Sequence, residues 1–270
     1  MEVAINIAQG ILGAAFAFAL LLVIELIAPN ERIGIVARAR AWAFWSVAIP
    51  VNVLVVMAMG KLWQSFGIKP LLVVPVGEHL NGWGWAALII AAIVAAMMND
   101  FFFYWFHRAE HVFLWRFHAV HHSIRDLHGG SGYHHITEPL FRFVLMTIPA
   151  SLVTTDVSII AVISTVLGLQ QLYVHSSTSA DLGWGRILFV DNRFHRIHHS
   201  LDERHFDKNF GAMTTLWDRL FGTAYWPAKD EWPAVGLAEI DEPRTFRQYL
   251  DLPLRFGREA ERVPQNGRIV

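Results

Sequence analysis

The chain has 270 residues, of which 54% are hydrophobic and only 17% are charged, against about 25% charged residues in ordinary soluble domains. The formal net charge of −1 lacks the basic excess of nucleic-acid-binding proteins, so no nucleic-acid partner is expected. The absence of cysteine excludes disulfides, thiolate ligands and iron–sulfur clusters, so a metal site in this chain must use nitrogen and oxygen ligands.

Three apolar runs dominate the first half of the chain. Residues 4–28 are long enough to cross a bilayer, since about 20 apolar residues suffice. The start Met1-Glu2 lacks the basic region of a cleaved signal peptide, which favours a retained membrane helix. The second run, about residues 41–60, contains Pro50, which we expect to kink the helix. The third run, residues 83–106, leads directly into His107.

The second half of the chain returns to the membrane and then leaves it. Residues 139–174 are apolar but interrupted near Thr154-Thr155-Asp156, which predicts two helices folded as a hairpin. The loop with Arg32, Arg38 and Arg40 is expected on the cytoplasmic side. This topology places every histidine-rich segment on that same side. From Asp181 onward the chain is polar.

These patterns predict an all-α integral-membrane helical bundle of about four to five membrane helices, with a cytosolic helical cap that carries a histidine-rich di-metal site. We expect three parts. Residues 1–82 are the N-terminal membrane helices and a connector, residues 83–225 are the histidine-rich domain, and residues 226–270 are a cytosolic C-terminal tail.

Eight of the 14 histidines fall in three short blocks: His107-x3-His111, His118-x2-His121-His122 and His195-x2-His198-His199. Residues four apart share one face of a helix, so each block can present imidazoles to a common point. Clustered neutral imidazoles without a ligand would be buried polar groups without partners. The blocks therefore predict metal binding, whereas the isolated His79, His128 and His205 are expected to be ordinary surface or core residues.

Asp100 precedes His107 by seven residues and lies on nearly the same helix face. We expect its carboxylate to accept a hydrogen bond from a ligand imidazole, which would fix the orientation of that ring.

The ligand set narrows the choice of metal without settling it. Imidazole suits zinc, copper, iron and nickel. A zinc hydrolase needs three or four ligands and an open position, and eight histidines exceed that number, which indicates two metals. The Glu-x-x-His pairs of carboxylate di-iron bundles do not match Glu110-His111. Three classes stay open: an oxygen-activating enzyme, a zinc-dependent membrane hydrolase and a non-catalytic metal-binding membrane protein.

The blocks resemble the three histidine boxes of the fatty acid hydroxylase/sterol desaturase superfamily. The resemblance covers about residues 90–225 and extends to the segments around the boxes. Residues 115–123 are similar to the second box, and Leu172-Tyr-Val-His175-Ser176 is similar to the isolated histidine before the third. Residues 217–223 resemble the closing segment, and His135-Ile136-Thr-Glu138 resembles a family segment in which Ile136 replaces the usual proline.

The resemblance implies a fatty acid hydroxylase-like di-iron domain in a multi-pass membrane enzyme, with two iron ions (Fe2+/Fe3+) as cofactor and O2 as co-substrate. Such an enzyme hydroxylates or desaturates an unactivated C–H position of a membrane lipid, with electrons from a separate ferredoxin- or cytochrome-type protein. The implied metal ligands are His107, His111, His118, His121, His122, His135, His175, His195, His198 and His199.

Several further residues have two interpretations each. Glu138 is expected to be a helix N-terminal acid, favoured by the helix dipole, with a hydrogen bond near the metals as the alternative. Asn209 is expected to stabilise a turn, or to donate a hydrogen bond near the metals. Five arginines flank the boxes and could dock an acidic electron donor or contact lipid phosphates: Arg108, Arg116, Arg125, Arg193 and Arg196.

Overall fold

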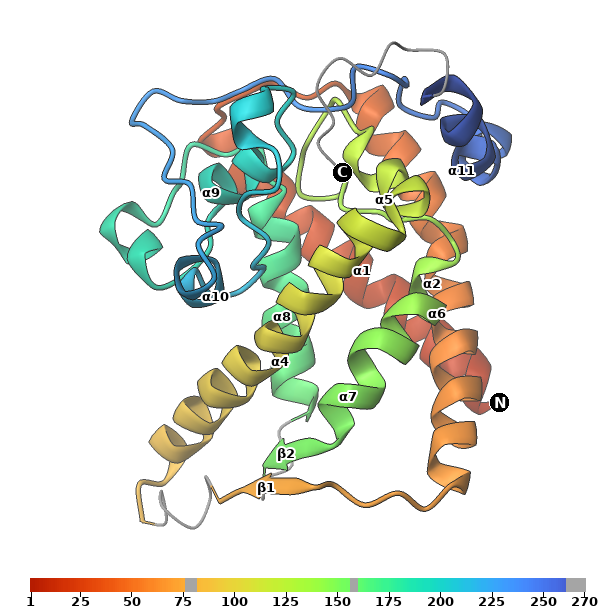
Figure 1. Ribbon diagram of the computed structural model, residues 1–270, viewed down its shortest axis with the longest axis vertical. Helices are drawn as coiled ribbons and strands as arrows, with labels where there is room; N and C mark the ends of the chain where they lie inside the picture. The colour runs from red at the N-terminus through yellow and green to blue at the C-terminus, as the bar shows by residue number, and fades with distance from the viewer. Residues whose placement is uncertain (76–81, 156–159, 261–270) are drawn as a thin grey trace.

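The computed structural model describes residues 1–75, 82–155 and 160–260 (Figure 1). Within these ranges three helices are long and apolar enough to cross a membrane: α1 (Glu2–Ile27), α2 (Ile35–Ser65) and α4 (Trp85–Phe113). Large apolar side chains on α1 point outward, with Phe16 72% and Leu12 69% exposed, as expected of a surface that faces lipid. The chain is therefore built as an integral membrane protein. Pro50 lies inside α2, and the helix continues through it.

The apolar segment 139–174 turns back on itself, as the sequence predicts. The first arm is a continuous succession of short helices: α6 (Glu138–Arg142), the π-helical turn η1 (Phe143–Thr147) and α7 (Ile148–Ser151). The second arm is the single helix α8 (Ile160–Val174). Neither arm has the length of the other three spans, so the described residues hold three candidate spans instead of the expected four to five.

One small parallel sheet departs from the all-helical expectation. Strands β1 (Leu72–Val74) and β2 (Val153–Thr155) pair with Leu72 opposite Val153. The two strands lie at the end of the bundle away from the cap (Figure 1). They join the connector after α2 to the turn of the hairpin.

The remaining helices are short and gather at the end of the bundle where α4 and α8 finish (Figure 1). The histidine blocks therefore all lie at one end, in agreement with the topology expected from the sequence. The cap elements are α5 (Trp115–His122), η2 (Gly183–Ile187), α9 (Asn192–His198), η3 (Glu203–His205), α10 (Leu216–Leu220) and α11 (Phe246–Ala260).

Residues 226–270, which we expected to be a cytosolic C-terminal tail, include the packed helix α11. This helix packs against α5, and its Tyr249, Leu252 and Phe256 are buried in one cluster with Ala119 and Val120 of the second histidine block. Apolar residues at positions 249, 252 and 256 recur at helical spacing, a pattern that the surrounding charges conceal. Residues 261–270 lie outside the described residues.

A buried carboxylate ties the membrane helices to the cap. Glu25 of α1 is 2% exposed. It accepts hydrogen bonds from the backbone N–H groups of Gly129 and Ser177, and it forms an ion pair with Arg38 of α2. A buried carboxylate with this many donors is satisfied, so Glu25 fixes two loops that flank the histidine site.

Candidate metal centre

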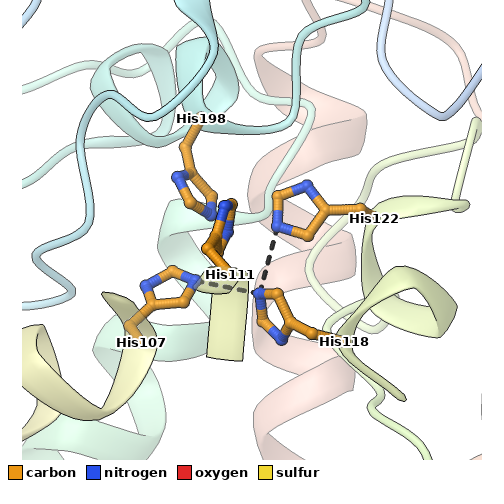
Figure 2. A group of neighbouring side chains, drawn as sticks. All are labelled: His107, His111, His118, His122 and His198. Atoms are coloured by element: carbon orange, nitrogen blue, oxygen red, sulfur yellow. Dashed lines mark hydrogen bonds between the residues drawn. The ribbon is translucent and has the colours of Figure 1, made fainter. Parts of the chain in front are cut away.

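Nine of the ten histidines expected as ligands converge into two groups. The five-histidine group is His107, His111, His118, His122 and His198 (Figure 2). The four-histidine group is His121, His175, His195 and His199. Within each group one nitrogen of every ring lies within 4.8 Å of the others. The clustered ring nitrogens come from the end of α4, from α5, from the residue after α8, and from α9 and the residue after it.

A helix break creates the five-histidine group. His107 and His111 lie one turn apart in the last part of α4, which ends at Phe113. The chain turns at Leu114 and begins α5 at Trp115. This turn brings the Nε2 atom of His118 to 3.0 Å from the Nε2 atom of His107. A dashed line in Figure 2 marks this contact.

Each His-x-x-His-His block contributes histidines to both groups. His118 and His122 are four residues apart on one face of α5, with their Nε2 atoms 3.1 Å apart. His121, on another face, joins the four-histidine group. In and after α9 the division is reversed: His195 and His199 join the four-histidine group, and His198 joins the other.

The nitrogen separations match the coordination sphere of a metal. Ligand nitrogens about 2.1 Å from one metal are about 3.0 Å apart in octahedral and about 3.4 Å apart in tetrahedral geometry. In the four-histidine group the Nε2 atom of His175 lies 3.2 Å from that of His121 and 3.1 Å from that of His195. Both groups therefore have the size of a metal site.

Two lone pairs face each other in the four-histidine group. The Nδ1 atom of His121 lies 3.2 Å from the carbonyl oxygen of Tyr133, and that of His175 lies 2.6 Å from the carbonyl oxygen of Gln171. Carbonyl oxygens only accept, so both Nδ1 atoms carry the proton and both Nε2 atoms present lone pairs. A cation between these Nε2 atoms removes the repulsion.

Protonation does not supply that cation near neutral pH. Burial lowers the pKa of His175 to about 4. Burial and the neighbouring imidazoles hold the pKa of His122 and His199 well below the ordinary histidine value. The rings are therefore neutral, with their lone pairs free. Neutral imidazole is the form that binds metal, so the residues present fit a pair of metal ions.

Backbone carbonyls and carboxylates lie against the outer nitrogens of the five-histidine group. The Nδ1 atoms of His107 and His198 lie 2.8 Å from the carbonyl oxygens of Phe210 and Lys208, to which they donate. Such contacts fix the tautomer and the ring orientation of a ligand histidine. The segment after η3 thus orients one ligand from α4 and one from α9.

Two carboxylates near this group were not identified from the sequence. Glu110 Oε1 lies 3.4 Å from His118 Nδ1, and Asp207 Oδ1 lies 3.4 Å from His111 Nδ1. Both separations exceed a normal hydrogen bond. Glu110 is 3% exposed, whereas the Asp207 side chain is 77% exposed. Neither contact has a local sequence signal, because each depends on how distant segments meet.

The role expected for Asp100 is wrong. Its carboxylate accepts hydrogen bonds from the backbone N–H groups of Ala212, Met213 and Thr214, at 2.9–3.1 Å, and contacts no ligand imidazole. Seven helical residues separate Asp100 from His107 by about 10 Å along the axis, too far for contact. Asp100 instead attaches the 212–214 segment to α4.

His135 is the expected ligand that the structure does not bring into either group. Its Nδ1 atom lies 2.8 Å from Thr137 Oγ1, and its ring packs against Phe117 and Tyr249. The adjacent His134 instead stacks on the ring of His121, with ring centroids 4.0 Å apart. His134 therefore borders the four-histidine group without belonging to it.

Glu138 and Asn209 have the positions that their structural interpretations predict. Glu138 is the first residue of α6 and forms an ion pair with Arg142 one turn later. Asn209 has a positive φ of 59°. Its side-chain amide donates to the carbonyls of Phe194 and Tyr225, which fixes the turn after the third block.

The isolated histidines also behave as expected where they are described. His128 Nδ1 accepts from the backbone N–H of Gly130. His205 contacts Ser200 and Glu231. His79 lies outside the described residues.

Most arginines that flank the blocks are engaged within the protein. Arg196 is buried and pairs with Glu31, and Arg125 pairs with Asp241. Arg116 is exposed. The structure thus leaves little of the expected arginine set free for a partner.

A membrane helical bundle that ends in two buried groups of histidines defines an integral-membrane protein with a histidine-based candidate metal centre. Residues 92–223 match the model of the fatty acid hydroxylase family, and this stretch contains both groups. The chain therefore carries a fatty acid hydroxylase domain, and the resemblance to that superfamily is confirmed.

Curated relatives are lipid hydroxylases and monooxygenases. The chain is 32% identical to ornithine lipid hydroxylase OlsE of Rhizobium tropici, over 47% of this chain and 39% of the relative. It is 31% identical to alkylglycerol monooxygenase of Danio rerio, over 44% and 27% respectively. The human alkylglycerol monooxygenase is 28% identical, over 50% of this chain and 30% of the relative. The chain thus spans well under half the length of these relatives. No solved structure matches the chain significantly.

Proposed function

We propose that the chain is an O2-dependent di-iron oxidoreductase that hydroxylates or desaturates an unactivated C–H position of a membrane lipid. The supporting observation is the division of nine histidines into neighbouring groups of five and four at one end of a membrane bundle. Imidazole ligands suit iron, and nine ligands exceed the three or four of a zinc hydrolase site. The names of the relatives favour hydroxylation over desaturation.

In this proposal the five-histidine group holds one iron and the four-histidine group holds the other. When bound, the two irons supply the activation of O2 needed to oxidise an unreactive C–H bond. The chain contributes rigid, neutral ligands and a buried environment. All members of the two groups except the partly buried His111 are buried, with His199 at 0% and His107 at 2% exposed, so bulk water is kept from the centre.

The substrate is proposed to be an amphiphilic membrane lipid that reaches the centre from the bilayer. His107 lies at the cap end of α4, a candidate membrane span, and its ring packs against Phe103, with centroids 5.2 Å apart. We expect an alkyl chain to approach the centre along this apolar helix. A separate ferredoxin- or cytochrome-type protein is proposed as the electron donor.

The histidine site is proposed to face the cytoplasm. The loop between α1 and α2 lies at the cap end and contains Arg32, and Arg38 and Arg40 follow in the first turns of α2. Arginine-rich short loops are retained on the cytoplasmic side. Reporter fusions to the α1–α2 loop and to the loop after β1 test the orientation independently of activity.

Metal analysis tests the proposal most directly. Protein purified without chelators from iron-57-grown cells is expected to hold two irons per chain, with an O2-sensitive diferrous Mössbauer signal. Supplied with O2 and a reductant system, it is expected to yield hydroxylated lipid from ornithine-lipid or alkylglycerol candidates. One zinc per chain that persists under iron-replete growth would contradict the proposal and support a membrane hydrolase.

A further inference from the structure

An exposed apolar surface lies on the cap elements η2 and α10. Trp184 is 85% exposed, Leu188 58% and Leu220 65%. Together with Ile187 and Leu216 these residues form what we call the η2–α10 face. Large exposed apolar patches mark interaction surfaces in folded proteins, so this face requires a partner.

The η2–α10 face is one continuous structure. The hydroxyl of Thr215 donates to the carbonyl of Ile187 over 2.7 Å, and the hydroxyl of Thr214 donates to the carbonyl of Leu188 over 2.8 Å. These hydrogen bonds join the end of η2 to the start of α10. The carbonyls of Ile187 and Leu188 are thus satisfied within the protein while the apolar side chains remain exposed, as contact with lipid requires.

The position of α10 along the length of α4 indicates which partner covers the η2–α10 face. The indole of Trp217 donates to the carbonyl of Met97 over 3.3 Å, and its ring lies 4.9 Å from the ring of Phe101. Figure 1 shows α10 beside α4, nearer the membrane end of the molecule than α9. A hydrocarbon core of about 30 Å takes up about 20 residues of helix, and counted from the start of α4 at Trp85 these include Met97 and Phe101.

We propose that the η2–α10 face is inserted into the bilayer leaflet on the histidine side, as a non-spanning anchor of the cap. The face continues the lipid-exposed surface of α4 at a depth that α4 itself places in the membrane. The exposed Arg219 lies at the same face, where its Nη1 atom donates to the carbonyl of Ile187 over 3.3 Å. From this position its guanidinium can reach lipid phosphates. A surface of this kind sits about 5–10 Å into the boundary between headgroups and acyl chains.

The absence of cysteine from the chain allows a direct test. Single variants Ile187→Cys and Leu220→Cys are labelled with a nitroxide and reconstituted in vesicles of phosphatidylethanolamine and phosphatidylglycerol. The accessibility of each label to O2 and to a water-soluble nickel chelate then reports its depth. Phe16→Cys on α1 is the lipid-facing control, and Arg247→Cys on α11, whose side chain is 92% exposed, is the aqueous control.

Insertion predicts that labels at 187 and 220 resemble the label at 16, with O2 access above chelate access. The result that overturns the proposal is chelate access at both positions equal to that at 247. Leu188→Cys replaces either variant that does not elute as a folded species. The test needs no metal, substrate or turnover, so its outcome is independent of the proposed oxygenase activity.

Discussion

The two histidine groups differ in what lies against their outer ring nitrogens. In the five-histidine group, carboxylates of Glu110 and Asp207 lie 3.4 Å from ligand rings. Backbone carbonyls accept from two histidines in each group, from His107 and His198 in one and from His121 and His175 in the other. In the four-histidine group the Nδ1 atoms of His195 and His199 have no hydrogen-bond partner in the described part of the chain. Carboxylates raise the basicity of ligand imidazoles, so the five-histidine group is expected to hold its metal more tightly.

Removal of one ligand from each group gives the largest effect. His198→Ala and His195→Ala are each expected to lose one metal per chain, and to lose activity by more than the ~10–100-fold typical of residues that only support a ligand. Elemental analysis of the purified variants measures the first effect. His135→Ala is the matched control, since its ring lies outside both groups, and it should retain full metal content. Loss of metal from that control would restore His135 as a ligand.

Acidification is expected to destabilise the metal-free protein by a few kcal/mol, because buried neutral histidines lie in and beside the four-histidine group. Burial lowers the pKa of His134 and of His175 from 6.5 to about 4. Below pH 6.5 these histidines bind protons in the unfolded chain, whereas in the folded chain they stay neutral down to about pH 4. The free energy of unfolding should therefore fall between pH 6.5 and about 4, and thermal unfolding of chelator-treated protein across this range measures it. A flat profile would show that these rings are not buried without metal.

Glu110→Gln sharpens the comparison by removing the buried carboxylate while keeping its shape. Metal affinity of the five-histidine group is expected to fall by about 10-fold, the lower end for a residue that supports a ligand, because the contact is longer than a hydrogen bond. Release of metal to a competing chelator should then show one faster phase and one unchanged phase. Equal acceleration of both phases would mean that Glu110 does not distinguish the groups.

Tyr249→Phe tests the backbone support of the four-histidine group. The Tyr249 hydroxyl donates to the carbonyl of His134 over 2.7 Å, next to the Tyr133 carbonyl that accepts from His121. Loss of one hydrogen bond should lower stability by about 1 kcal/mol. Thermal unfolding measures this loss, and the metal released first should be that of the four-histidine group.

Asp207→Asn should have the smallest effect. The Asp207 side chain is 77% exposed, and pairs screened by water contribute about 1 kcal/mol or less. Metal affinity of the five-histidine group is expected to fall by no more than about fivefold, measured by the same chelator competition. An effect equal to that of Glu110→Gln would argue against burial as the source of the difference.

The errors of sequence interpretation share one cause. Asp100 lies on the same helix face as His107, yet its carboxylate is used by the backbone of residues 212–214. The ring of His134 stacks on that of His121, but the ring of the next residue, His135, packs against Phe117 and Tyr249. Periodicity gives the face of a residue, and it does not say which distant segment will cover that face.

The sequence by itself determined the membrane class, the nitrogen-based ligand set and the family of the domain. These properties are local: apolar length sets the spans, and four-residue spacing places imidazoles on one helix face. Only the tertiary structure decided which histidine joins which group, which carboxylates approach the ligands, and that α11 packs beneath α5. Those outcomes depend on the helix break at Leu114 and on contacts between residues far apart in the chain. The free energy of such contacts depends on three-dimensional packing, which cannot be read from a short stretch of sequence.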